Sequence, residues 1–88
     1  TLVSYMLKTY KIVITGRVQG VGFRPFVFTL ANNFKLNGTV SNNENGVIIF
    51  ISGKKDNIDS FYCELIKNPP PVSKIKDSKI QEIQFEDF

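Results

Sequence analysis

Histidine and tryptophan are absent from the 88-residue chain, and Cys63 is its only cysteine. A single cysteine excludes a disulfide within the chain and a cysteine cluster that binds zinc. The lack of histidine also argues against a serine-protease triad and a metal hydrolase. Cys63 lies beside the apolar stripe of a predicted helix, so we expect a half-buried structural thiol rather than a nucleophile.

Long apolar runs are also missing, and the N-terminus lacks the pattern of a signal peptide. We therefore expect a soluble, cytoplasmic protein that has no membrane partner. The length of the chain and its 42% of hydrophobic residues fit one small domain with a modest core. Residues 1–7 are predicted to form an N-terminal extension and residues 8–88 the folded domain, with a monomer as the default state.

Acidic side chains are missing from the first half of the sequence. Residues 1–43 contain five of the 11 basic side chains and none of the eight acidic ones. Such a positive region attracts small anions, although a nucleic acid would be attracted in the same way. The absence of carboxylates from this region also argues against a Mg²⁺ site there.

The most informative segment that is present runs from Gly16 to Pro25, with the sequence GRVQGVGFRP. Glycines can adopt positive φ angles, so several backbone N–H groups of such a loop can converge on one anion. Pro25 favours the start of a helix, whose positive dipole end would then face the loop. The segment therefore predicts a phosphate site in front of a helix, near residue 25.

Arg24 gives this segment a second anion-binding feature. A cation in the first turn opposes the helix dipole, unless an anion lies between the guanidinium group and the backbone amides. The alternative is a glycine-rich turn that carries a surface arginine. Nucleotide binding is disfavoured, because the segment matches neither Gly-x-Gly-x-x-Gly nor a Walker loop.

Hydrophobic periodicity predicts the element order β-α-β-β-α-β. That order is the ferredoxin-like α+β plan, an antiparallel sheet with two helices on one face. RNA-binding domains share this plan, but the sequence lacks their aromatic strand signature, so we expect no nucleic-acid partner. The predicted strands are 8–17, 36–43, 47–51 and a last one around Ile80, Ile83 and Phe85; the helices are about 25–35 and 56–68, the second capped by Asp56.

The loop, followed by Gly38-Thr-Val-Ser-Asn42 and Asn45-Gly46-Val47, resembles the acylphosphatases over about residues 8–86. The resemblance implies that Arg24 binds the substrate and that Asn42 positions the attacking water. It also implies that the loop amides hold the phosphoryl group. Thr39 departs from the family, which usually has tryptophan there; we expect this to affect packing more than chemistry. The implied phosphate-binding residues are Gln19, Gly20, Val21, Gly22, Phe23 and Arg24.

Two segments resemble more closely the N-terminal acylphosphatase-like domain of the carbamoyltransferases that mature [NiFe] hydrogenases. They are Arg24-Pro-Phe-Val27 and Pro69-Pro-Pro-Val-Ser-Lys-Ile75. This resemblance implies an acylphosphatase-like domain over residues 8–88, excised from such a protein or free-standing, with carbamoyl phosphate as a plausible substrate.

Two functions remain open from the sequence. The first is an enzyme that hydrolyses acyl phosphates and is inhibited by, or releases, inorganic phosphate. Holding a phosphoryl group and orienting water requires neither a metal nor another cofactor, and a neutral asparagine amide can orient water. The alternative is a catalytically weak module that binds phosphate or carbamoyl phosphate. Asn42 and Asn43 could then be ordinary residues beside a hairpin turn.

Overall fold

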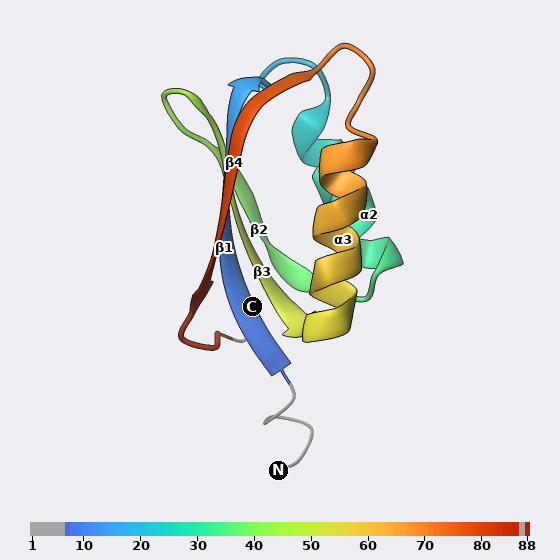
Figure 1. Cartoon of the computed structure of the whole chain (residues 1–88), viewed down its shortest axis with the longest axis vertical. Helices are drawn as coiled ribbons and strands as arrows, with labels where there is room; N and C mark the ends of the chain where they lie inside the picture. The colour runs from blue at the N-terminus through green and yellow to red at the C-terminus, as the bar shows by residue number, and fades with distance from the viewer. Residues whose placement is uncertain (1–6, 87) are drawn as a thin grey trace.

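The computed structural model describes residues 7–86 and 88, which form four strands and two helices (Figure 1). Residues 1–6 of the predicted extension lie outside the described residues, whereas Leu7 begins the first strand. In chain order, the elements are β1 (Leu7–Arg17), α2 (Phe23–Asn33), β2 (Asn37–Asn42), β3 (Gly46–Lys54), α3 (Lys55–Lys67) and β4 (Lys74–Ile83).

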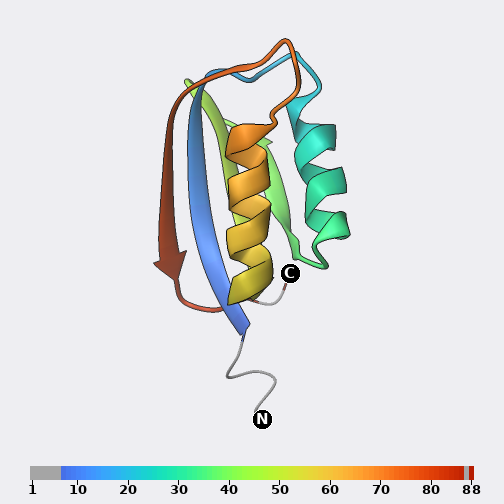
Figure 2. The same cartoon turned by 45° about the vertical axis from the view of Figure 1, so that its right-hand side comes forward.

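The four strands form one antiparallel sheet in the order β2-β3-β1-β4. Both helices lie against the same face of this sheet, as Figures 1 and 2 show from two directions. The predicted ferredoxin-like α+β architecture is therefore confirmed. Neither helix in this described part of the chain is long and apolar enough to cross a membrane.

The core lies between the sheet and the two helices. Alternation along β1 points Ile12 and Ile14 toward the helices, and both side chains are fully buried. Val27 of α2 and Phe61 of α3 pack into the same cluster. The core thus anchors the end of β1 and the start of α2, which are the two elements on either side of the glycine-rich loop.

Both helices begin differently from the prediction. α2 begins at Phe23, because Gly22 adopts a left-handed conformation immediately before it. Pro25 is instead its third residue, where a backbone N–H would have no partner within the helix. α3 begins after Lys54, and Asp56 lies in its first turn without capping it. Asp56 can still stabilise that end through the helix dipole.

Two further details of the sequence prediction are wrong. Cys63 is exposed, not half-buried. The buried stripe of α3 consists of Ile58, Phe61 and Leu65, and Cys63 lies about 200° around the helix from Phe61. The last strand ends at Ile83, so Phe85 lies beyond it.

After β4, the chain turns back across the end of the sheet that lies away from the glycine-rich loop. The Glu86 backbone N–H donates to Thr9 Oγ1 at 2.8 Å, and Ser52 Oγ donates to the Glu86 carbonyl at 2.7 Å. Thr9 and Ser52 are themselves hydrogen-bonded and buried. These contacts attach the chain after β4 to both central strands.

Candidate active site

The loop at residues 18–22 connects β1 to α2 at one end of the domain (Figure 1). Gly20 and Gly22 have φ angles of 74° and 76°, values that favour glycine. Apart from the neighbouring residues in the chain, no described residue has an atom within 4 Å of where a Cβ would stand at either position. The space beside the loop is therefore open to a ligand.

The N-terminus of α2 lies beside this space, and no acidic side chain among residues 7–86 and 88 lines it. No side chain of the described residues caps the helix, and its first turn contains no acidic residue. The first amides of a helix have no partner within the helix, and the positive end of the dipole lies there. The arrangement favours a bound anion at the start of α2.

A cavity of about 250 Å³ lies at this end of the domain. It brings the start of α2 together with Asn42, the last residue of β2. The volume suits a phosphoryl group with a small substituent. The lining residues are Val18, Gln19, Gly20, Gly22, Phe23, Arg24, Pro25 and Asn42.

Arg24 is the charged residue among those that line the cavity. Its side chain is exposed, and no ion pair or side-chain hydrogen bond engages it within residues 7–86 and 88. No carboxylate lines the cavity, and those residues contain no cluster of three or more side chains suited to a metal ion. The guanidinium group is thus available to an anion.

Asn42 is held by the turn that joins β2 to β3. The Asn43 N–H donates to the Gly46 carbonyl at 2.9 Å, and the Asn45 N–H donates to Asn43 Oδ1 at the same distance. The Gly16 N–H also donates to the Asn45 carbonyl at 3.2 Å, which connects the turn to β1. The side chain of Asn42 is exposed, so it can reach a water molecule.

The side chain of Gln19 contacts the turn. Its Nε2 donates to the carbonyls of Asn43 and Gly46. The sequence predicts this residue only as part of the phosphate loop. These partners lie 24 and 27 positions after Gln19 in the chain, so the contacts leave no local signal in the sequence.

Val21 is the one predicted phosphate-binding residue whose side chain does not line the cavity. It is half-buried and packs against the hydrophobic core. A contribution of Val21 to anion binding would therefore come from its backbone N–H.

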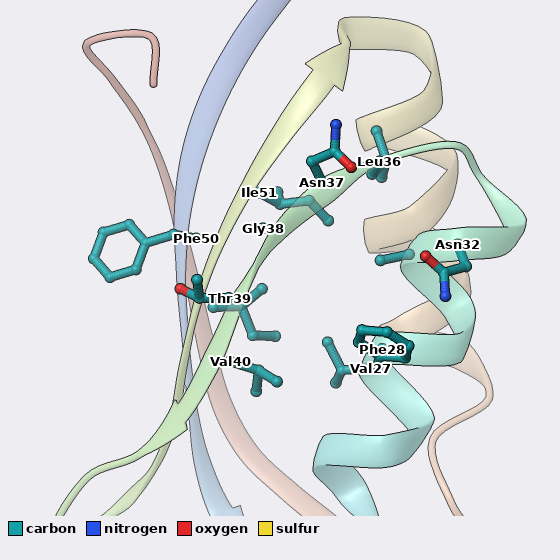
Figure 3. A pocket seen from close by; sticks show the side chains of 12 residues that line it. Val27, Phe28, Asn32, Leu36, Asn37, Gly38, Thr39, Val40, Phe50 and Ile51 are labelled. Atoms are coloured by element: carbon teal, nitrogen blue, oxygen red, sulfur yellow. The ribbon is translucent and has the colours of Figure 1, made fainter. Parts of the chain in front are cut away.

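A larger apolar groove of about 500 Å³ lies between α2 and β2 (Figure 3). Val27, Phe28 and Val40 are among the side chains that line it. Thr39 borders this groove and pairs with Phe50 of β3, and it does not line the phosphate cavity. The departure from the usual tryptophan at position 39 thus lies outside the candidate site.

Fold and site together define a ferredoxin-like domain with a cavity at the first β-α connection, which Arg24 and Asn42 line. The acylphosphatase family model matches residues 10–88, and the chain belongs to the acylphosphatase family. The acylphosphatase of Bacillus subtilis is 40% identical over 73 residues, which cover 83% of this chain and 80% of that protein. The acylphosphatase structure from Coxiella burnetii has a TM-score of 0.91 at 28% identity and covers 100% of this chain and 93% of its own.

The chain is also similar to part of a much longer protein. Carbamoyltransferase HypF from Synechocystis is 43% identical over 83 residues, which cover 94% of this chain and 11% of that protein. The structure of full-length HypF in its phosphate- and nucleotide-bound form has a TM-score of 0.91 at 39% identity, over 93% of this chain and 11% of that one. The chain thus spans about a tenth of the length of these relatives.

Proposed function

We propose that residues 8–88 form a domain that hydrolyses acyl phosphates, the mixed anhydrides of carboxylic acids and phosphoric acid, to a carboxylate and inorganic phosphate. The observation that carries this proposal is the single cavity that the loop, the start of α2 and Asn42 line together. It combines the N-terminus of α2, the guanidinium group of Arg24 and the neutral amide of Asn42, and no described residue caps the helix or pairs with the guanidinium group. Membership of the acylphosphatase family supports the same reaction.

In this mechanism, the backbone amides of Gln19–Phe23 and the guanidinium group of Arg24 bind the phosphoryl oxygens. Charge-assisted hydrogen bonds of this kind stabilise the charge that develops during phosphoryl transfer. Asn42 orients a water molecule in line with the bond that breaks. The site thus positions the substrate and the water, and it stabilises the charge of the phosphoryl group.

The reaction proceeds by attack of the water oxygen on phosphorus. The bond between phosphorus and the bridging acyl oxygen breaks, and the carboxylate leaves with the electron pair. A proton of the water passes to a phosphoryl oxygen of the substrate itself, because none of the described residues that line the cavity carries a general base. A carboxylate is a good leaving group, so the protein need not supply a strong acid.

Carbamoyl phosphate is the acyl phosphate that we propose as the physiological substrate. Similarity to proteins named carbamoyltransferase HypF supports this choice. The chain spans only about a tenth of the length of those proteins, and this small share favours a second candidate function. In that case the domain binds phosphate or carbamoyl phosphate for chemistry that other regions perform.

Hydrolysis of benzoyl phosphate and carbamoyl phosphate in the presence of EDTA tests the proposed function. We expect saturable turnover of both compounds that EDTA does not change, with competitive inhibition by inorganic phosphate. The rate of carboxylate or phosphate release provides the measurement. Phosphate binding without any turnover would instead support the binding module.

The pH dependence provides a second test. The described residues that line the cavity include no histidine, cysteine or carboxylate, and the closest carboxylate in the sequence, Glu44, lies in the turn beyond Asn42. We therefore expect kcat for benzoyl phosphate to vary by less than about twofold between pH 7 and 9. A bell-shaped profile centred in this range would reveal a protein acid or base and contradict the mechanism.

A further inference from the structure

Gln19 belongs to the phosphate loop, but its side-chain amide is bound to a different element. Nε2 donates to the Gly46 carbonyl at 2.7 Å and also to the Asn43 carbonyl. An amide NH₂ group has two hydrogens, and these two contacts use both. The side chain therefore has no donor left for a phosphate oxygen.

The two acceptors belong to the turn that follows Asn42. The carbonyls of Asn43 and Gly46 lie at the two ends of this turn, and the Asn43 N–H donates to the same Gly46 carbonyl. Gln19 thus contacts both ends of the turn with one rigid amide group. The position of the turn relative to the loop determines where Asn42 stands in the cavity.

A second connection to the turn comes from β1, before the loop begins. The Gly16 N–H donates to the Asn45 carbonyl, but Gly16 belongs to β1, beside a register shift in its pairing with β4, and not to the loop at residues 18–22. Within the described residues, Gln19 provides the side-chain hydrogen bonds that join residues 18–22 to the turn. It is therefore placed to determine the separation between the phosphate-binding amides and Asn42.

We propose that Gln19 is a positioning residue, which holds Asn42 at the correct distance from the phosphate loop for in-line attack by water. This inference rests on the proposed function. A shift of about 1 Å in a catalytic group can lower a rate about 100-fold. Phosphate binding depends on Arg24 and on the loop amides, so it should change much less.

Gln19→Met tests the proposal, because methionine keeps the length of the side chain and removes both donors. We expect kcat for benzoyl phosphate to fall about 10- to 100-fold, with the Kd for inorganic phosphate within about threefold of the original value. Gln19→Glu replaces the donors with acceptors of similar shape, so it should lower kcat at least as much. Tyr62→Phe is the control, because it removes the hydrogen bond to Ser78 between α3 and β4, away from the cavity. It should leave kcat unchanged.

A double-mutant cycle separates positioning from general support of the loop. In an Asn42→Ala background there is no amide to position, so adding Gln19→Met should change kcat by less than about twofold. An equal loss in both backgrounds would overturn the proposal. A parallel loss of kcat and phosphate affinity, or an unchanged kcat, would also overturn it.

Nuclear magnetic resonance monitors the environment of the Asn42 side chain, and this measurement does not depend on turnover. In ¹⁵N-labelled protein, Gln19→Met should shift the side-chain amide signals of Asn42 and reduce their response to added inorganic phosphate. Unchanged Asn42 signals would contradict positioning even in a protein that hydrolyses nothing. The absence of turnover by the unsubstituted domain would contradict the proposed function alone.

Discussion

Arg24→Ala is expected to lower kcat/KM for benzoyl phosphate by about 10³-fold and to weaken inorganic phosphate binding by about 10- to 100-fold. Arg24 is the charged residue among those that line the cavity, and no carboxylate competes for it within the described residues. Its removal leaves only backbone amides and the helix dipole to stabilise the phosphoryl charge. Steady-state kinetics and phosphate titration by calorimetry measure the two losses.

Arg17→Ala is the matched control for Arg24. Arg17 is an exposed arginine at the end of β1, and it does not line the cavity. We expect its removal to change kcat/KM by less than about threefold, as for an exposed charge that acts only through long-range attraction. Similar losses in the two variants would mean that general positive charge, rather than a specific contact, attracts the substrate.

Asn42→Ala is expected to lower kcat by about 10²- to 10³-fold, with the Kd for inorganic phosphate within about threefold. Asn42 lines the cavity from β2, separately from the loop amides that we propose bind the phosphoryl oxygens. Its loss removes the orientation of water and leaves the phosphate contacts in place. Kinetics and phosphate titration on the same preparation separate the two effects.

Asn37→Ala provides the control for Asn42. Asn37 is an exposed asparagine at the opposite end of β2, and it lies outside the phosphate cavity. The substitution should leave kcat unchanged. A loss of phosphate binding in Asn42→Ala that equals its loss of turnover would instead assign Asn42 a structural role in the turn.

The sequence predicted the fold well, because its signals are local. Alternation of Ile12 and Ile14 in β1 and the spacing of Ile58, Phe61 and Leu65 in α3 follow from strand and helix geometry. The predicted first residues of the two helices were less accurate. Gly22 can end the loop and begin α2 through its left-handed conformation, whereas proline preference alone favoured a start two residues later.

The candidate site was predictable only in part. The loop glycines and Arg24 are close together in the sequence, and the family resemblance identified Asn42 as their partner. The contacts of Gln19 with the turn depend on how β1 and β3 pair, because that pairing places Thr15 opposite Gly46. A prediction of this contact requires the strand register, which periodicity does not provide.

The contacts of Glu86 with Thr9 and Ser52 determine where the polypeptide enters and leaves the domain. Thr9 lies near the start of β1, and the phosphate loop follows its end at Arg17. Eight residues of extended strand separate them by about 26 Å. A fusion partner or an affinity tag attached before Leu7 or after Glu86 would therefore join the domain at the end opposite the phosphate cavity. A protein immobilised through such a tag would keep that cavity open to solvent.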